Sequence, residues 1–479
     1  MLNDQLKSVC TLLFLVNSLI SVNGQSSSGT WEVYPDFQTN AVYGIHQHKD
    51  VVYRAGWFSL FMWDGAEWQI FGGGISGAGG NTSARDLISF HLNGNADSVL
   101  VIGGYFFKAG SLDVGSIAYW DGQEYGTFGT GVDGEIAALT VYNGDLIAGG
   151  SFDKAGGTDV NNIARWDGLQ WHALGNGVYD NVQGSADGVT EMVVWEDKLY
   201  VVGDFSHAGN NLEVNYVACW DGLVWSDLDG GMTLNGEDFT GMRGCAVHSD
   251  MLVVAGAFDW AGSTEAINVA GWDGTMWHDF PPGPDPIGGF LNLRQAAQTV
   301  ASYNNLLYVG ADFTNTAGPA AEALAVWKDN QWQAVDGGLF GGDLFGPVIY
   351  DMSVVPHGEG EESLLMGGLF EFANGMATDN VARYTTPSII IDIPDNENGG
   401  AIDCLFYPNP AYSSFTIELQ TAPLNSTFLT LSSTSGLNVY TTPIVETKTQ
   451  IDISHLPAGI YIIKVRNDKS SMVRRLIKR

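Results

Sequence analysis

Short runs of alternating apolar and polar residues fill most of the chain, and pairs of Gly, Asn and Asp separate them. This pattern is typical of β-strands joined by tight turns. Residues 138–174 contain four such runs in succession, ALTVYNG, DLIAGGSF, NIARW and QWHAL. Asn143-Gly144 and Asp167-Gly168 can supply the positive φ angles that two-residue hairpin turns require. We therefore predict a four-stranded antiparallel meander in this segment.

The meander is repeated along the chain. Its last two strands read RWDGLQWHALGNGV at 165–178, and near-copies begin at residues 62, 119, 219, 271 and 326. The first aromatic residue of each copy is Trp63, Trp120, Trp166, Trp220, Trp272, Trp327 or, in a seventh copy, Tyr384. These aromatics are spaced by 46 to 57 residues. A period near 50 residues is typical of propeller blades rather than of helical solenoids.

A second aromatic residue follows in the last strand of most copies. In the Asp-Gly hairpin, Trp171 is expected opposite Ala164, which shares a face of the sheet with Trp166 because side chains alternate along a strand. Both tryptophans should then point to one side of the sheet. A single sheet cannot bury such a face, but radial stacking covers each sheet with the next. The aromatic pair is therefore predicted to join neighbouring blades.

The two ends of the repeat region complement each other. The seventh copy ends at Tyr384 without an outer strand, whereas TWEVYPDF at 30–37 matches the outer strand of the other copies with nothing before it. We predict an all-β fold in which the strand at Trp31 completes the last blade. The result is a seven-bladed β-propeller over residues 30–387.

Charge is unevenly distributed. The chain of 479 residues has a net charge of −34, and because residues 403–479 hold eight Lys/Arg and five Asp/Glu, residues 25–402 carry −37. Such an acidic body repels nucleic acid and anionic lipid, so neither is expected as a partner. It could attract Ca²⁺, although like charge that keeps the surface solvated explains the excess equally well. No other cofactor is indicated.

The N-terminal segment resembles a targeting signal. Lys7 precedes an apolar run at 9–20 that is too short to span a bilayer. We interpret residues 1–24 as a secretory signal peptide cleaved before Gln25, so a secreted monomer with no membrane span is expected. Cys219 and Cys245 fall on neighbouring repeats, where two buried free thiols are favoured over a disulfide.

Candidate catalytic groups are sparse. His48 and His248 occupy a position that is aromatic in other repeats and are predicted to pack, while His172 and His278 should face outward. His46 and His48 form an H-x-H on one strand face, but no third metal ligand is apparent, so no metal site is predicted. The sequence contains no G-x-S-x-G, P-loop or H-E-x-x-H motif.

Variable loops should gather on one face of the propeller. In a meander, first-to-second and third-to-fourth turns emerge at one end, and the other connections emerge at the opposite end. The former are tight here, whereas the latter are long and varied, so they form the candidate binding face. The acidic residues on these loops, which could suit Ca²⁺ or glycan hydroxyls, are Asp133, Asp180, Asp187, Glu237, Asp238, Asp285 and Asp343.

The repeat resembles known propeller families. Gly-Gly pairs at 103–104, 149–150 and 367–368, each followed by an aromatic pair, are similar to kelch-type propellers of the galactose-oxidase superfamily. The longer pattern at 149–171 resembles the propellers of fungal cortical polarity markers and of many secreted bacterial proteins. This resemblance implies the fold but not the function, because propellers host many activities. The copper oxidases of the superfamily need a cross-linked Cys and Tyr plus two His, a set that we cannot place.

Residues 403–479 follow a different pattern. A Pro/Gly/Asn-rich acidic stretch at 388–402 is typical of a linker. Beyond it, alternating strands with turns at 435–436 and 457–459 predict a small all-β sandwich. The motif YPNP, the L-x-x-G-x-Y segment at 456–461 and a Lys/Arg-rich final strand closely resemble the type A sorting domain of the type IX secretion system of Bacteroidetes.

This resemblance implies export through both membranes. The partners would be the type IX machinery and a sorting peptidase, and the body would be released or anchored at the outer-membrane surface. The residues that would form the sorting signal are Tyr407, Pro408, Asn409, Pro410, Gly459, Tyr461, Lys464, Arg474, Arg475 and Lys478.

We therefore expect a secreted or cell-surface binding or adhesion module for glycan or protein. The alternative is an extracellular enzyme, acting on polysaccharide, with acidic residues on the loop face. A cluster of buried carboxylates or a three-ligand metal site at the mouth of the central channel would favour the enzyme. An open face that carries only exposed acids and aromatics would favour binding.

Overall fold

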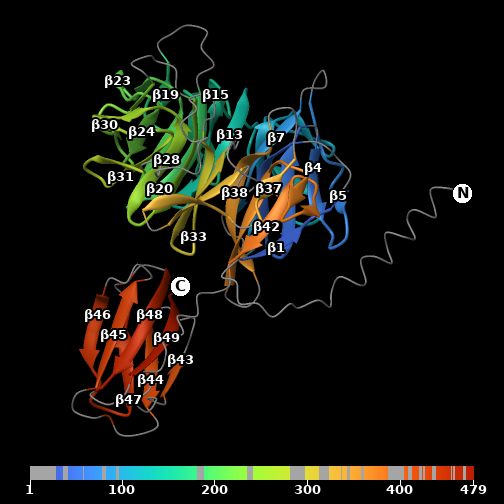
Figure 1. Ribbon diagram of the computed structural model, residues 1–479. Coiled ribbons are helices and arrows are strands. Elements are labelled where there is room, and N and C mark those ends of the chain that lie inside the picture. Colours follow the sequence, from blue (N-terminus) through green and yellow to red (C-terminus); the bar gives the residue numbers. More distant parts are fainter. Residues whose placement is uncertain are drawn as a thin grey trace, which may run out of the picture.

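The structure is a computed structural model. It describes residues 29–35, 41–57, 59–77, 82–92, 97–180, 188–234, 241–280, 297–311, 323–328, 330–335, 337–341, 346–357, 361–386, 404–407, 413–419, 423, 427–433, 438–454, 456, 459–467 and 471–478. The described residues are all-β (Figure 1). Within them, no helix has the length and apolar character needed to cross a membrane. The predicted signal peptide lies outside the described residues.

Seven four-stranded antiparallel sheets occupy the described part of residues 30–385, each in the order first, second, third and fourth strand. The first strands are β2 (Val42–His48), β7 (Ser83–Phe90), β13 (Glu135–Tyr142), β20 (Gly188–Trp195), β27 (Gly241–His248), β33 (Ala297–Tyr303) and β38 (Val348–His357). The second strands are β3 (Val51–Gly56), β8 (Val99–Tyr105), β14 (Asp145–Ser151), β21 (Lys198–Asp204), β28 (Met251–Ala257), β34 (Leu306–Ala311) and β39 (Glu361–Leu369).

The aromatic repeat builds the outer half of each sheet. The third strands are β4 (Ser59–Trp63), β11 (Ile117–Trp120), β17 (Ile163–Trp166), β24 (Val217–Trp220), β31 (Val269–Trp272), β35 (Leu324–Lys328) and β42 (Val381–Thr385). The fourth strands are β5 (Trp68–Ile70), β12 (Tyr125–Thr127), β18 (Trp171–Ala173), β25 (Trp225–Ser226), β32 (Trp277–Asp279), β36 (Gln331–Ala334) and, in the seventh sheet, β1 (Thr30–Val33).

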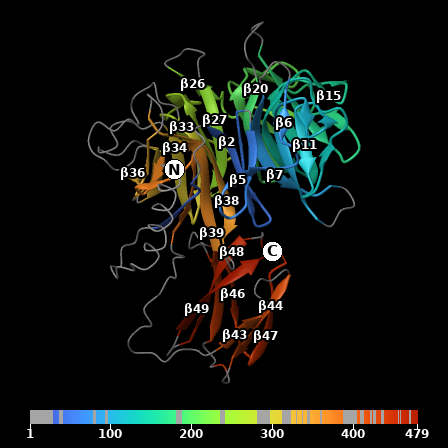
Figure 2. The ribbon, with the colours of Figure 1, turned by 90° about the vertical axis from the view of Figure 1, so that its right-hand side faces the viewer.

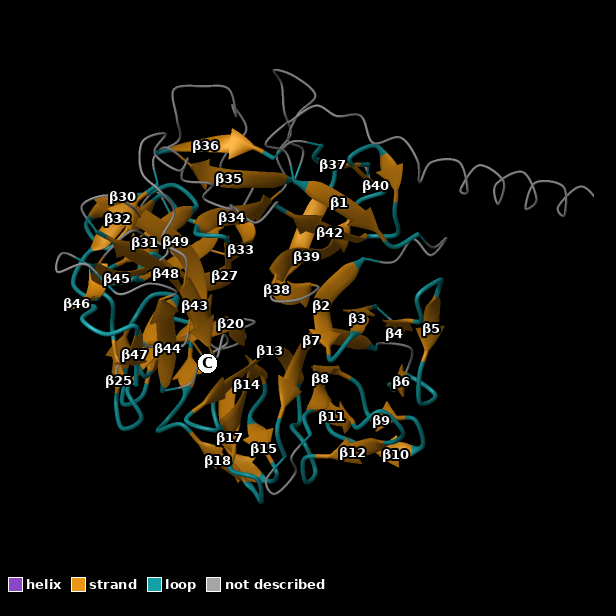
Figure 3. Ribbon diagram, turned by 90° about the horizontal axis from the view of Figure 1, so that it is seen from below, coloured by secondary structure: helices purple, strands orange, loops and turns teal. Residues whose placement is uncertain are grey.

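The first strands succeed one another in a cycle. Each contacts the first strands of the sheets before and after it, and β38 contacts β2. In Figure 3, β2, β7, β13 and β38 lie innermost, and β5, β12, β18 and β36 lie at the rim. The predicted pairing of the two ends of the repeat region is confirmed, because β1 pairs with β42 and Trp31 is opposite Tyr384.

The predicted register of the aromatic hairpin is wrong by two residues, although the shared face is correct. Trp171 pairs with Trp166 itself, and Ala164 pairs with Ala173. The Asp167 carboxylate accepts hydrogen bonds from the backbone N–H groups of Leu169 (2.8 Å) and Gln170 (2.9 Å). This cap holds a four-residue loop where a two-residue turn was predicted, so the fourth strand starts later.

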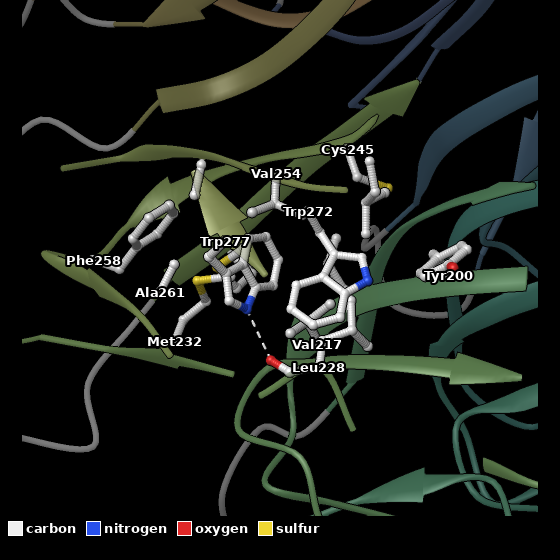
Figure 4. Close-up of a cluster of buried hydrophobic side chains, with 14 of the residues drawn as sticks. Tyr200, Val217, Leu228, Met232, Cys245, Val254, Phe258, Ala261, Trp272 and Trp277 are labelled. Atoms are coloured by element: carbon white, nitrogen blue, oxygen red, sulfur yellow. Dashed lines mark hydrogen bonds between the residues drawn. The ribbon is translucent and has the colours of Figure 1, made fainter. Parts of the chain in front are cut away.

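The second aromatic residue joins its sheet to the preceding one. The indole Nε1 of Trp277 donates to the carbonyl of Leu228, 2.8 Å away, in a cluster that includes residues of both sheets (Figure 4). Four further boundaries have the same bond, namely Tyr125 to Phe71 (3.1 Å), Trp171 to Phe128 (2.9 Å), Trp225 to Leu174 (2.9 Å) and Trp332 to Phe280 (3.2 Å). The aromatic pair therefore joins neighbouring sheets, as predicted.

The C-terminal segment contains two antiparallel sheets with one shared core (Figure 2). The buried cluster includes Phe415 and Ile417 from one sheet and Leu429 and Ile463 from the other, as expected for a small sandwich. Its strands are β43 (Cys404–Tyr407), β44 (Ser414–Leu419), β45 (Phe428–Ser433), β46 (Asn438–Pro443), β47 (Lys448–Asp452), β48 (Gly459–Arg466) and β49 (Ser471–Lys478).

Candidate binding face and central channel

Short accessory strands bring the variable connections together on one face. They occupy the second-to-third connections and the segments that leave the fourth strands: β6 (Ile75–Ser76), β9 (Lys108–Ala109), β10 (Leu112–Asp113), β15 (Lys154–Ala155), β16 (Thr158–Asp159), β19 (Val178–Tyr179), β22 (His207–Ala208), β23 (Leu212–Glu213), β26 (Met232–Thr233), β29 (Trp260–Ala261), β30 (Thr264–Glu265), β37 (Leu339–Phe340), β40 (Phe372–Ala373) and β41 (Met376–Ala377).

These strands pair between sheets. The segment that leaves one sheet pairs with the second-to-third hairpin of the next, as in β6 with β9, β19 with β22, β26 with β29 and β37 with β40. We call this set of pairings the collar, and the end of the sheets where it lies the loop face. Because the two kinds of variable connection pair directly, they share one face, as predicted. The opposite end carries the tight turns.

Two of the seven predicted loop acids lie within the described residues. The Asp133 carboxylate accepts hydrogen bonds from the backbone N–H groups of Asp153 (2.9 Å) and Lys154 (2.8 Å), in the hairpin of the next sheet. Asp180 accepts a bond from Ser206 Oγ at 2.8 Å, again in the next hairpin. Both acids therefore form hydrogen bonds across the collar, from a segment that leaves one sheet to the hairpin of the next. The other five, Asp187, Glu237, Asp238, Asp285 and Asp343, lie outside the described residues.

Exposed aromatic side chains concentrate on the loop face. Among the described residues of the seven sheets and their connections, the aromatic side chains at least 36% exposed are Trp57, Phe107, Trp260 and Phe372. Each follows a second strand, in the connection to the third. Exposed aliphatic side chains and methionines lie at both ends, as Leu112 and Met376 do on the loop face and Leu169, Leu223 and Met276 do in the tight turns. Aromatic surface is thus specific to the predicted binding face.

An irregularity in every first strand places one residue at this face. The register with the second strand shifts by one residue near the start of each first strand, which marks a β-bulge. The extra residues are Tyr43, Arg85, Ala137, Thr190, Arg243, Gln298 and Tyr350. All seven are partly or fully exposed.

Three of these residues form a cluster with two neighbours. The rings of Tyr43 and Tyr350 lie 5.1 Å apart, and the Trp57 ring lies 6.4 Å from Tyr43. The Arg85 guanidinium lies 4.6 Å from the Tyr43 ring centre. Arg85 Nε also donates to Glu135 Oε1 at 2.6 Å. We call these five residues the aromatic cluster.

A cavity of about 340 Å³ lies between the first strands, and residues of all seven contribute to its lining. The acidic residues of the lining are Asp86, Glu191 and Asp351, and the lining contains no Lys, Arg or His. Most other lining side chains are apolar or small, including Leu139, Cys245 and Val247. The ionisable side chains that face one another across this cavity, which we call the channel, are therefore carboxyl groups with no basic partner in the lining.

The channel carboxylates connect neighbouring first strands. Asp86 accepts hydrogen bonds from the backbone N–H groups of Leu87 and, in the next sheet, Leu139, each at 2.6 Å. Asp351 accepts one from Ile45 of the next sheet at 2.8 Å. First strands have an edge that faces the channel, and the carboxylates satisfy N–H groups on it.

The same geometry raises the pKa of each carboxyl group. Burial, with a smaller contribution from the charge of Asp351, raises the pKa of Asp86 to about 8. Burial raises the pKa of Asp351 to about 6, although backbone N–H groups oppose the shift. Burial and the charge of Asp86 raise the pKa of Glu191 well above its usual range. Among the described residues, no group of three or more His, Cys, Asp and Glu side chains could hold a metal ion.

The histidines have structural partners. His46 Nε2 and His48 Nδ1 both bond to Ser89 Oγ of the next sheet, at 2.9 and 2.8 Å, so the H-x-H contacts a hydroxyl group. His248 Nδ1 bonds to Ser302 Oγ at 2.9 Å across an equivalent boundary. Burial, followed by the charge of His48, lowers the pKa of His46 to about 4. His48 and His248 are buried, as their repeat position predicted.

The remaining predicted groups agree with the repeat. His172 and His278 are partly exposed and pair with Asp167 and Asp273 in the tight turns, at 2.6 and 2.7 Å. Cys219 and Cys245 are buried free thiols. The channel acids were missed, although an alignment of the first strands would have placed Asp86, Glu191 and Asp351 at one position.

The predicted sorting residues lie mainly on two strands. Gly459, Tyr461 and Lys464 are in β48, and Arg474, Arg475 and Lys478 are in the adjacent β49. Tyr407 is exposed at the end of β43, and its hydroxyl donates to Glu418. Pro408, Asn409 and Pro410 lie outside the described residues.

Comparison with known proteins identifies the C-terminal segment. Residues 405–479 match the family described as a secretion system C-terminal sorting domain. This domain implies that the protein is a Bacteroidetes-type cargo exported by type IX secretion to the cell surface or beyond, and that it interacts with the type IX machinery. No curated protein matches the chain.

Several solved structures show distant similarity. PorZ, a bacterial surface component of the type IX secretion system of Porphyromonas gingivalis, is 14% identical with a TM-score of 0.46, and the match covers 92% of this chain and 59% of PorZ. The extracellular domain of a one-component system from B. thetaiotaomicron is 12% identical with a TM-score of 0.40, covering 92% and 57%. A fungal AA5-family alcohol oxidase with copper is 10% identical with a TM-score of 0.40, covering 94% and 99%. The chain thus spans less than two thirds of the first two structures.

Proposed function

We propose that residues 30–387 form a seven-bladed β-propeller that acts outside the cell as a binding or adhesion module, with glycan or protein as its ligand. The propeller is supported by the seven four-stranded sheets, by the cyclic contacts of their first strands and by the pairing of β1 with β42. The ligand is proposed to bind at the loop face. There, the five loop acids outside the described residues could contact ligand hydroxyls or Ca²⁺.

One observation carries the binding proposal. The strongly exposed aromatic side chains of the described sheets and their connections all lie in second-to-third connections on the loop face. Exposing an aromatic ring to water has a cost in free energy, and aromatic residues are enriched where proteins bind partners. The tight-turn face of the described sheets has no Phe, Trp or Tyr of comparable exposure.

The place where the chain leaves the propeller is also consistent with a ligand at the loop face. Strand β42 runs from the loop face to the tight-turn face, and β1 pairs with it in the opposite direction. Just after β42, the Thr386 N–H donates to Tyr303 Oη at 3.0 Å. Tyr303 ends β33 at the tight-turn end. Chain that leads away from the propeller therefore starts at the face opposite the proposed ligand, so a tether there leaves the loop face accessible.

A binding screen tests the proposal. The chain from residue 25 is applied to glycan and extracellular-matrix protein arrays, with and without calcium chelator. We expect saturable binding that weakens in Trp260→Ala, in Phe372→Ala or in alanine variants of the aromatic cluster. Binding should persist in the tight-turn control Leu169→Ala. Loss of binding with chelator would assign Ca²⁺ to the loop face. Binding that depends only on the tight-turn face, or no binding at all, would contradict the proposal.

The channel carboxylates favour a second candidate, an extracellular enzyme that acts on polysaccharide. A carboxyl group whose pKa is about 8, as for Asp86, holds a proton at neutral pH and can act as a general acid beside an ionised partner. The backbone bonds of Asp86 and Asp351 support the structural role instead. Reducing-sugar release from polysaccharide substrates tests this candidate, which predicts activity that Asp86→Asn abolishes without unfolding the protein.

A further inference from the structure

We infer that the aromatic cluster of Tyr43, Trp57, Arg85, Glu135 and Tyr350 is a binding site for a ring of a neutral saccharide. The inference rests on the proposed binding function and adds the class of ligand and the place where it binds. The five residues come from the seventh, first, second and third sheets, which are consecutive in the cycle of first strands.

The β-bulges position the centre of the cluster. Tyr43 and Tyr350 are the extra residues of β2 and β38, two first strands that contact each other. A bulge re-aims a side chain that a regular strand would point to one of its two faces. The two rings meet at 5.1 Å with an angle of 49° between their planes. The sequence therefore builds a pair of tyrosines at the loop-face end of the channel.

Trp57 extends this pair outward. It follows β3 at the loop face and bridges to Ser83, the first residue of β7. Its ring is tilted by 47° to that of Tyr43, and the residue is 46% exposed. Tyr43 thus contacts the rings of both Tyr350 and Trp57, and the most exposed of the three rings is the indole.

A polar pair borders the rings. Arg85 lies over Tyr43 and its Nε donates to Glu135 Oε1, while Ser83 Oγ reaches the same carboxylate oxygen at 3.3 Å. The side chains of Arg85 and Glu135 are 32% and 34% exposed. The pair therefore presents both guanidinium donors and carboxylate acceptors to solvent beside an aromatic surface.

This combination fits the two kinds of surface on a pyranose ring. The C–H groups on the faces of the ring are attracted to the negative face of an aromatic ring, and the hydroxyl groups around its edge both donate and accept hydrogen bonds. A single sugar ring needs one aromatic face and a few polar atoms. A protein partner would need roughly 800 Å² on this side of the interface.

Charge selects neutral saccharides over anionic ones. The chain carries 54 acidic and 20 basic residues. Next to the cluster, Asp351 follows Tyr350 and lines the channel, and its pKa of about 6 leaves it ionised at neutral pH. Within the cluster, the Glu135 carboxylate already pairs with the Arg85 guanidinium. The field of the acidic body at this site therefore opposes a uronate or sulfate group.

Calorimetric titration with defined oligosaccharides tests the inference. The neutral probes are hexasaccharides of glucose in α-1,4 and β-1,4 linkage, of mannose and of N-acetylglucosamine, and the anionic probes are oligogalacturonate and heparin fragments. We expect at least one neutral probe to bind and Trp57→Ala to weaken it about tenfold, which corresponds to about 1.4 kcal/mol. Arg85→Met should weaken it as well, and Trp57→Phe should restore most of the affinity.

Further variants separate this inference from the proposed function. Leu169→Ala, in a tight turn at the opposite end, is the control and should leave saccharide affinity unchanged. If Trp260→Ala or Phe372→Ala loses binding and Trp57→Ala does not, or if only anionic glycans or proteins bind at the loop face, the inference is wrong and the binding function stands. If no ligand of any class binds, both fail. Thermal melting of each variant verifies that it is folded.

Discussion

Two kinds of boundary join neighbouring sheets in this protein. At five boundaries, a ring N–H or O–H of one sheet donates to a carbonyl just after the fourth strand of the preceding sheet. At the boundary between the seventh sheet and the first, which we call the seam, the equivalent Trp68 Nε1 is buried without a hydrogen-bond partner. There, Arg54 lies 4.6 Å from the Trp68 ring centre and pairs with Asp379 at 2.7 Å. At the seam, a buried ion pair therefore lies beside Trp68, whose indole N–H lacks the hydrogen bond found at the other five boundaries.

The difference follows from how each boundary forms. The five repeated boundaries join sheets that are consecutive in sequence, and the buried side-chain bond at each of them is neutral. The seventh sheet needs β1 from the other end of the chain. If the two sheets joined in a different register, the buried charges would lose their partners, and an unpaired charge in the interior is strongly unfavourable. We therefore expect the Arg54–Asp379 pair to fix the correct pairing of the two ends more than to add stability.

Removing one member of that pair should have the largest effect. Both side chains are almost fully buried, at 4% and 6% exposure, so Arg54→Met removes the guanidinium that pairs with the buried Asp379 carboxylate. We expect a loss of about 3–5 kcal/mol in the free energy of unfolding. Urea denaturation measures it, and Lys154→Met, which breaks the exposed pair with Asp159, is the control and should change the free energy of unfolding far less.

A double variant sharpens this prediction. Arg54→Met combined with Asp379→Leu removes both charges and should recover most of the lost stability while permitting alternative pairings of β1. Proteolysis near residue 30 would then increase although the unfolding free energy is close to the original value. If the double variant keeps β1 as protected as the unmodified chain does, the pair contributes to stability rather than to specificity.

The channel acids at the two kinds of boundary should make the free energy of unfolding depend on pH in different ranges. Asp351 bonds across the seam, and Asp86 bonds across a repeated boundary. The folded pKa values, about 6 and about 8, lie above the usual range. Their contribution to stability is therefore complete at low pH and is lost as pH rises through those values.

Asp86→Asn should flatten the fall in unfolding free energy between pH 6 and pH 8. One proton accounts for at most about 1.4 kcal/mol per pH unit. Asp351→Asn should change mainly the range below pH 6. Urea denaturation at several pH values measures both, and Asp113→Asn, which removes an exposed carboxylate, is the control. Equal slopes in Asp86→Asn and the unmodified chain would contradict the assignment.

The indole bond itself should give the smallest difference. Trp277→Phe removes one of the two hydrogen bonds that the Leu228 carbonyl accepts, and the bond from the Gly231 N–H remains, whereas Trp68→Phe at the seam removes no such bond. Both changes lose similar ring area. We expect Trp277→Phe to cost about 0.5–1.5 kcal/mol more than Trp68→Phe in denaturant unfolding. Equal costs would show that packing alone joins the sheets.

The sequence predicted the features that each repeat encodes locally. Strand order, the shared face of the tryptophans and the pairing of β1 with β42 follow from alternation and from the count of copies. The hairpin register was missed because a side chain decides it, namely the Asp167 carboxylate that caps two backbone N–H groups. The channel acids were missed because their burial depends on all seven first strands, which are far apart in sequence.

The collar has a consequence for how this molecule can change over time. In sequence, residues 181–187 and 235–240 each lie between a fourth strand and the following first strand, just beyond a collar segment, β19 or β26. Collar pairing joins the neighbouring sheets before either segment begins. We therefore expect substitutions and insertions in these two segments to leave the sheets unaltered, so a lineage can acquire new ligands by exchanging them one at a time.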